Sequence, residues 1–135
     1  MVVEIGVRYR DLDPLGHVNN AVFLSYLEVA RVEYFRRLGL LEASLGAGGA
    51  PVVVRAEVDY KRPINYGDLV KVGVRVSRVG RTSFDMRYEL RAGVELAALA
   101  RTVHVLLGAS GKPRRIPKSL RSRIAVMENL PVEGL

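Results

Sequence analysis

Apolar and polar residues alternate with a period of two over most of this chain. Residues 2–9 alternate in this way, and after Pro51 the pattern returns in four stretches, 52–61, 70–76, 83–90 and about 95–107. A period of two is typical of strands with one buried face. In the first of these four stretches, alternate residues are expected to share one face: Val52, Val54, Ala56, Val58 and Tyr60. Short turns separate the four, so consecutive strands are expected to be antiparallel neighbours in one five-stranded sheet.

A helical period of three and four residues interrupts this alternation once. It places on one face Phe23, Tyr26, Leu27, Ala30, Tyr34 and Leu38. Only four polar residues stand between Ala21 and Phe35, so the first half of the helix is apolar almost all round. Such a helix is expected to be wrapped rather than to rest on one surface. One curved antiparallel sheet around one long helix, ending near Gly39, predicts an α+β fold.

The remaining segments complete a predicted single domain of residues 1–135. Residues 41–50 are small and glycine-rich, and we interpret them as a connection, either a plain linker or a lid over a pocket. A short helix is expected after Pro117, with Leu120, Ile124 and Met127 on one face. Residues 130–135 are expected to form a loose tail.

Composition excludes several kinds of site and location. Apolar residues make up 49% of the chain, yet no apolar run approaches the roughly 18 residues that would cross a bilayer. With no basic segment before an apolar one at the N-terminus, we expect a cytoplasmic protein without a membrane partner. There is no cysteine, and the two histidines are far apart in sequence, so neither a metal site nor a cofactor is expected.

The net charge of +7 favours an anionic partner, although a solvated, arginine-rich surface explains it equally well. The cations are scattered over strands and helix ends rather than gathered in one basic arm, so no nucleic acid partner is expected. Arginine outnumbers lysine and cysteine is absent, which hints at a thermophilic source.

The polar turn before the long helix is the candidate site. It contains Asp11, Asp13, Pro14, Gly16, His17, Asn19 and Asn20. The first N–H groups of a helix lack partners within it and carry partial positive charge, so a helix start can hold an oxyanion or a polarised carbonyl. A carboxylate just upstream could act on a group held there. Asn19 or Asn20 is expected to cap the helix.

Three stretches resemble a known family, the hotdog-fold acyl-CoA thioesterases of the 4-hydroxybenzoyl-CoA thioesterase type. They are Tyr9 to Asn20, Tyr26 to Arg31, and Tyr60 to Pro63 with Gly67-Asp68. The resemblance covers about Val2 to Pro117 and implies a five-stranded sheet wrapped around one helix. It also implies a homodimer with the two sheets joined edge to edge, often paired again into a homotetramer, and active sites at the subunit interface.

Matching residues by position, the resemblance implies that Asp13 is the catalytic carboxylate and that the backbone N–H of Asn20 polarises the thioester carbonyl. His17 is a further catalytic candidate, although a turn histidine bonded to backbone is the more common situation. The resemblance also implies contacts of Arg81, Thr82 and Ser83 with CoA. Further substrate-binding candidates are Asn19, the acyl-tunnel residues Val22, Phe23 and Tyr26, and the phosphate candidates Arg62, Arg114 and Arg115.

The predicted reaction is hydrolysis of an acyl-CoA, or of a thioester on an acyl carrier protein, to a free acid. Asp13 would act as general base on water or as a nucleophile that forms a mixed anhydride. Alternatives are a hotdog dehydratase or hydratase and a non-catalytic acyl-thioester-binding module. Asp13 could also simply hold the turn through a side-chain hydrogen bond. Asp11 and His104 are expected to be structural, and Arg62 fits an interface ion pair equally well.

Overall fold

The computed structural model describes residues 1–40 and 50–135. In chain order the elements are β1 (Val2–Gly6), the 3₁₀ helix η1 (Tyr9–Asp11), α1 (Asn20–Leu38), β2 (Ala50–Tyr60), β3 (Leu69–Val79), β4 (Ser83–Ala92), β5 (Glu95–Leu107) and α3 (Lys118–Met127). The segment interpreted as a linker or lid, residues 41–50, lies outside the described residues except for Ala50. None of the helices in the described ranges is long and apolar enough to cross a membrane.

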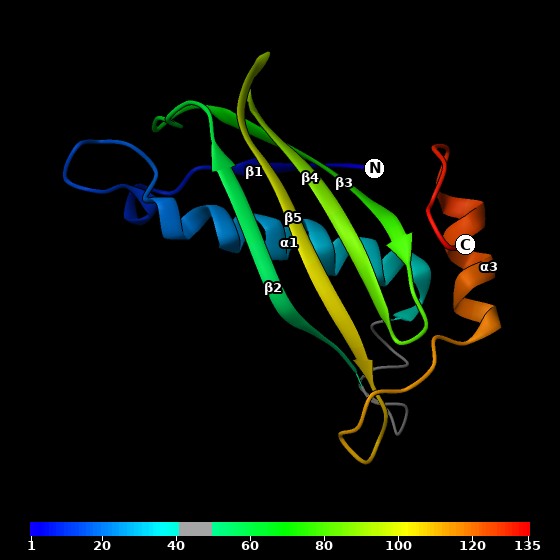
Figure 1. Cartoon of the computed structure of the whole chain (residues 1–135). Coiled ribbons are helices and arrows are strands. Elements are labelled where there is room, and N and C mark those ends of the chain that lie inside the picture. The colour runs from blue at the N-terminus through cyan, green and yellow to red at the C-terminus, as the bar shows by residue number, and fades with distance from the viewer. Residues whose placement is uncertain (41–49) are drawn as a thin grey trace.

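The five strands form one antiparallel sheet in the order β1-β3-β4-β5-β2, and α1 lies across one of its faces (Figure 1). This arrangement confirms the predicted α+β fold, including the short C-terminal helix. The pairs β3–β4 and β4–β5 are antiparallel neighbours as predicted, but the expected pairing of β2 with β3 is wrong, because β2 pairs with β5 at the far edge of the sheet. Because β1 is only five residues long, it covers the first part of β3, from Leu69 to Gly73. Both β1 and β2 are edge strands, so one long side of β2 has no neighbouring strand in the described chain.

The core lies between α1 and the inner face of the sheet. Alternate valines of β3 (Val70, Val72, Val74 and Val76) are buried there, as are Phe84, Met86, Tyr88 and Leu90 of β4. The helical stripe predicted from Phe23 to Leu38 is buried against them. The far side of α1 is not wrapped, because Leu24, Val29 and Val32 remain exposed. The expectation of a helix surrounded on all sides is therefore wrong for the described chain.

A β-bulge in β2 changes which residues face the helix. The register with β5 skips Val54: Val53 pairs with His104, whereas Arg55 pairs with Val103. A bulge inserts one extra residue and so reverses the alternation beyond it. Val52 therefore lies on the outer face of the sheet while Ala56, Val58 and Tyr60 face inward. The predicted common face for Val52 and Ala56 is wrong, because the alternation does not continue through Val54.

The segment after α3 runs along the edge of β3 that β1 leaves uncovered. The backbone N–H of Val79 donates to the carbonyl of Glu133 at 2.8 Å, and the N–H of Glu133 donates to that of Ser77 at 3.1 Å. The carboxylate of Glu128 accepts hydrogen bonds from the hydroxyl of the buried Tyr34 and from the N–H of Val76. Where the sequence predicts a loose tail, the structure thus shows backbone pairing with the exposed part of an edge strand.

Replacing Glu128 by alanine is expected to lower the free energy of unfolding by about 2 kcal/mol. The change removes the acceptor of the buried Tyr34 hydroxyl and of the Val76 N–H, and a buried donor left without a partner is costly. Chemical denaturation gives the measurement. Glu133→Ala is the control, because the structure bonds Glu133 through its backbone. Equal stability of the two variants would contradict the proposed anchoring role.

A chain of buried polar groups crosses β4 and β5 under α1. The hydroxyl of Tyr88 lies 2.6 Å from that of Thr102, which lies 2.7 Å from Nε2 of His104. The imidazole ring stacks on Phe84, with ring centroids 4.8 Å apart. Burial, reinforced by the Arg31 guanidinium and opposed by Asp85, lowers the pKa of His104 to about 4. These contacts agree with the expected structural role of His104.

This lowered pKa predicts acid sensitivity in a defined window. The unfolded chain, with a histidine pKa of about 6.5, binds a proton that the folded chain rejects between pH 6.5 and 4. The free energy of unfolding should therefore fall by about 3 kcal/mol as the pH drops through this window. Denaturation curves should show this slope for the native protein and for His17→Gln but not for His104→Phe. An unchanged slope in His104→Phe would refute the assignment.

Candidate active site

The turn between η1 and α1 is a small closed loop. The backbone N–H of Asp13 donates to the carbonyl of His17 at 2.7 Å, and the N–H of Gly16 donates to the carbonyl of Asp13 at 3.0 Å. Gly16 has a φ of 82°, a left-handed conformation that glycine adopts without strain. The N–H of Val18 then donates to the carbonyl of Ile64 at 2.8 Å, which fixes the loop against the segment between β2 and β3.

The half-buried Asp13 side chain uses one of its two oxygens to hold this loop. Oδ1 accepts hydrogen bonds from the N–H groups of Leu15 at 2.9 Å and His17 at 3.3 Å. This is the turn-holding contact that the sequence offered as the alternative to catalysis. Within residues 1–40 and 50–135, Oδ2 has no hydrogen-bond partner. One oxygen therefore orients the carboxylate, and the other is available to a water molecule or substrate.

Of the two expected cap residues, Asn19 is the one that caps α1, because its side chain accepts the N–H of Ala21 at 2.9 Å. The N–H of Val22 donates to the carbonyl of Asn19 at 2.9 Å. The N–H of Asn20, the residue between Asn19 and Ala21, has no acceptor in the described part of the chain. It is therefore an unpaired donor at the positive end of a 19-residue helix, in the position that the family resemblance implies for carbonyl polarisation.

Asp11 stabilises the turn by joining it to Arg8 and to Tyr26 of α1. Its buried carboxylate accepts hydrogen bonds from the backbone and guanidinium of Arg8 at 3.0 to 3.2 Å and from the hydroxyl of Tyr26 at 2.8 Å. Burial raises the pKa of Asp11, but these donors outweigh it and the net pKa is lowered. Burial and the Asp11 carboxylate together raise the pKa of the Tyr26 phenol. Asp11 therefore remains ionised, and its predicted structural role is confirmed.

His17 takes part in the turn through its backbone, which bonds with both the backbone and the side chain of Asp13. Across the described ranges, its half-buried ring has no hydrogen-bond partner. The three acyl-tunnel candidates lie in the first part of α1. Phe23 and Tyr26 are buried in the core and Val22 is half-buried.

Sequence reasoning missed the role of Tyr60. Its hydroxyl donates to the carbonyl of Asn20 at 2.8 Å, and its ring packs edge-on against Phe23 with centroids 5.0 Å apart. These contacts join the end of β2 to the start of α1 and so fix the position of the unpaired Asn20 N–H. Tyr60 belongs to the stretch Tyr60 to Pro63 that carries the family resemblance, which was the available signal. Arg62 forms a surface ion pair with Glu95 at 3.3 Å.

The turn between β3 and β4, where the expected CoA-contacting residues lie, and the turn before α1, which carries Asp13, are at opposite ends of the sheet (Figure 1). Arg81 and Thr82 lie in the turn from β3 to β4 and Ser83 begins β4, whereas Asp13 follows the strand β1 that pairs with the first residues of β3. The 11 residues of β3 span about 36 Å. The turn that carries Arg114 and Arg115 lies beside Arg81, since the N–H of Ile116 donates to the Arg81 carbonyl at 2.9 Å. One chain therefore does not bring the two groups together.

A family model described as the thioesterase-like superfamily matches residues 7–124. The chain belongs to this superfamily. The membership confirms the resemblance to hotdog-fold thioesterases and places the chain among thioester hydrolases. In the described residues, no three His, Cys, Asp or Glu side chains form a group that could hold a metal ion.

Several known proteins are similar to this chain over nearly its whole length. A solved thioesterase from Thermus thermophilus, complexed with coenzyme A and Zn, is 48% identical, with a TM-score of 0.88 over 97% of this chain and 96% of its own. A 1,4-dihydroxy-2-naphthoyl-CoA hydrolase of Synechococcus elongatus is 28% identical over 89% of this chain and 91% of its own. A chloroplastic acyl-acyl carrier protein thioesterase of Arabidopsis thaliana is 31% identical over 90% of this chain and 65% of its own.

Proposed function

We propose that this protein hydrolyses the thioester bond of an acyl-CoA, with Asp13 as its catalytic carboxylate. The observation that carries the proposal is the pairing, in one turn, of a carboxylate with one unbonded oxygen and a helix that starts with the unpaired N–H of Asn20. A thioester needs few catalytic groups, because its carbonyl is electrophilic and a thiolate leaves readily. A base and an oxyanion donor are enough.

In the general-base route, Asp13 removes a proton from water as the water oxygen attacks the carbonyl carbon. The negative charge that forms on the carbonyl oxygen is stabilised by the Asn20 N–H and by the helix dipole. The intermediate then expels the CoA thiolate, which takes up a proton, and the carboxylic acid is released. In the nucleophilic route, Asp13 attacks the carbonyl carbon, the C–S bond breaks and the CoA thiolate leaves and takes up a proton, and water then hydrolyses the mixed anhydride to the free acid and the Asp13 carboxylate. The unbonded Oδ2 of Asp13 could be the reacting oxygen in either route.

We further propose that the active form is a homodimer joined through β2. Three consecutive valines of this edge strand are exposed, with Val53 at 45% and Val54 at 58%. An unpaired apolar edge needs a partner strand. Antiparallel pairing of two β2 strands about a twofold axis reverses one sheet relative to the other. The end that carries Arg81 and Arg114 then approaches the partner's helix start, which brings together the two groups that one chain keeps apart.

A surface on α1 is available for pairing two dimers into a tetramer. Leu24, Val29 and Val32 form an exposed apolar stripe on the side of the helix away from its own sheet. Burying this stripe against a second dimer would complete the expected wrapping of an apolar helix. The homotetramer would thus use two different apolar surfaces, the β2 edge and the α1 stripe.

Coenzyme A release from a panel of short, long and aromatic acyl-CoAs, followed by thiol detection, tests the proposed activity. The same acyl groups on an acyl carrier protein test the carrier, whose acidic surface would also suit the net charge of +7. Hydrolysis of at least one substrate is expected. Hydration of crotonyl-CoA without hydrolysis would favour the dehydratase alternative. Saturable binding of all thioesters without turnover would favour the binding module.

A further inference from the structure

Three arginines stand in a row across the outer face of the sheet. In the strand register Arg75 of β3 faces Arg87 of β4, and Arg87 faces Arg101 of β5. Their side chains point away from α1, because their neighbours along β3, Val74 and Val76, are buried toward it. Directly opposed residues have Cβ atoms about 5 Å apart, and like charges at that separation destabilise a sheet. The row therefore needs anions to balance it.

The chain supplies anions at one end of this row. The guanidinium of Arg101 donates to Oδ2 of the buried Asp85 at 2.8 and 3.0 Å and lies 3.5 Å from the carboxylate of Glu57. Arg78 binds the other oxygen of Asp85 at 2.8 Å. Burial raises the pKa of Asp85, but the two arginines outweigh it and lower the pKa overall. Arg101 is therefore paired with two carboxylates, those of Asp85 and Glu57.

The other two arginines of the row lack such partners. Nη2 of Arg75 donates to the carbonyl of Pro131 at 2.5 Å, but its Nε is buried without a hydrogen-bond partner. Arg87 is exposed and forms no ion pair with any residue that the structure describes. The guanidinium groups of Arg75 and Arg87 carry ten potential N–H donors in all. In the described residues, one backbone carbonyl, that of Pro131, accepts a hydrogen bond from them. The buried Nε of Arg75 is thus a donor that a bound anion could pair.

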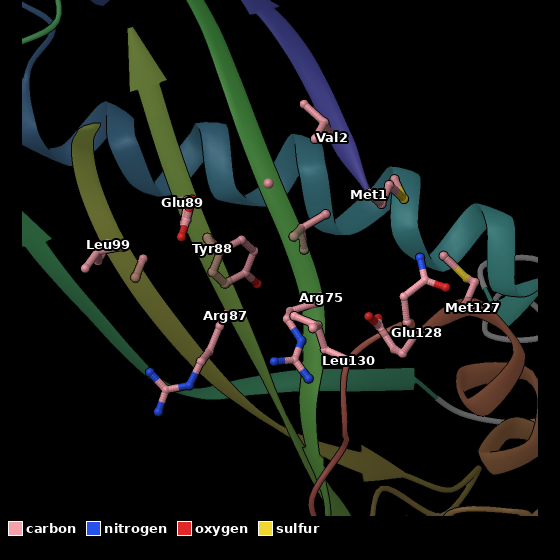
Figure 2. A pocket seen from close by; sticks show the side chains of 14 residues that line it. Met1, Val2, Arg75, Arg87, Tyr88, Glu89, Leu99, Met127, Glu128 and Leu130 are labelled. Carbon is pink, nitrogen blue, oxygen red and sulfur yellow. The ribbon is translucent and has the colours of Figure 1, made fainter. Parts of the chain in front are cut away.

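Both arginines line a cavity of about 560 Å³ between the sheet and the segment after α3 (Figure 2). Apolar side chains form much of the remaining wall: Met1, Val2, Leu99, Met127 and Leu130. Its two acidic residues have other partners. Glu89 pairs with Arg91 at 3.3 Å, and Glu128 accepts the Tyr34 hydroxyl and the Val76 N–H.

We propose that this cavity binds a small organic anion, a carboxylate or phosphate joined to an apolar body. The planar guanidinium forks of Arg75 and Arg87 match the oxygens of either head group, and the apolar wall matches the body. The volume lies within the range typical of small-molecule sites. Because α1 and the turn that holds Asp13 lie on the other face of the sheet, this is a second site and not an extension of the candidate active site.

Calorimetric titration with octanoate and with octyl phosphate tests the proposal on the whole native protein. Saturable binding is expected, and Arg87→Gln should weaken it by about tenfold or more, since a charge-assisted hydrogen bond is lost. Arg75→Gln should have an effect of similar size. Arg55→Gln is the matched control, because it removes the same charge from an exposed position on the same face, beside Glu57 rather than the cavity. Its affinity should equal that of the native protein.

Three results would overturn the proposal: no saturable binding, equal affinity for uncharged octanol, and equal affinity in the native, Arg75→Gln and Arg87→Gln proteins. Octanoate is also a product that a thioesterase of this kind would release, so it can occupy the candidate active site. Binding there would be unaffected by the change at Arg87. A failure of the second site is therefore distinguishable from a failure of the proposed hydrolysis, which is measured by thiol release.

Discussion

Asp13→Asn is expected to lower kcat/KM for thioester hydrolysis by about 10³- to 10⁴-fold without changing the stability of the fold. Asparagine retains an oxygen at the position of Oδ1, so the N–H groups of Leu15 and His17 keep their acceptor. It cannot remove a proton from water or attack a carbonyl. The variant therefore separates the two roles of the side chain, which a change to alanine would not do. Thiol release and thermal unfolding, measured together, provide the test.

Asp11→Asn is the informative comparison for this variant. It removes the negative charge that pairs with Arg8 and accepts the Tyr26 hydroxyl, so the free energy of unfolding should fall. Activity should be affected through the changed shape of the turn. Asp13→Asn should show the opposite pattern, with unfolding unchanged and turnover nearly abolished. If Asp13→Asn retained activity within about threefold of the native protein, Asp13 would be a turn residue only, and the proposed mechanism would fail.

The second large effect is expected at the exposed edge of β2. Val54→Asp should raise the dissociation constant of the proposed dimer by at least about a thousandfold, because two carboxylates would be buried near the twofold axis without partners. Val54 has no facing residue on β5, so the sheet of each chain should remain intact. Light scattering coupled to size exclusion gives the mass. Activity should fall together with dimer content as the protein is diluted.

Val126→Asp provides the control for this change. Val126 is an exposed valine on α3, far from the β2 edge, and the same substitution there should leave both mass and activity unchanged. A Val54→Asp protein that remained a dimer would place the interface elsewhere. A Val54→Asp monomer with full activity would show that one chain contains a complete site, contrary to the separation of Asp13 from Arg81.

Local patterns along the chain were sufficient to predict most of this fold. The period of two identified all five strands, and the period of three and four identified α1 and its buried stripe. The short turns correctly predicted the antiparallel pairs β3–β4 and β4–β5, but not that β2 pairs with β5 instead of β3. Asn19 as the cap of α1 could also be predicted, because capping depends on residues adjacent in sequence. The family resemblance extended these patterns to a reaction class, since motifs near a reacting group tolerate little change in geometry.

Other features depend on contacts between residues distant in sequence. The bulge at Val54 depends on how β2 pairs with β5, and alternation of residue types does not reveal an inserted residue. The segment after α3 looks polar and loose in sequence, yet it pairs with β3 because β1 is too short to cover that edge. Burial of Phe23 and Tyr26 likewise follows from the packing of α1 against the sheet.

The sequence by itself determined the element order, the α+β class and the turn in which Asp13 precedes a helix start, because each depends on neighbours a few residues apart. Only the tertiary structure decided that one oxygen of Asp13 holds the turn while the other is unbonded, and that Arg81 and Arg114 lie at the far end of the sheet. It also aligned Arg75 with Arg87 across two strands. The physical reason is that strand register and burial are set by long-range pairing, which residue type alone does not encode.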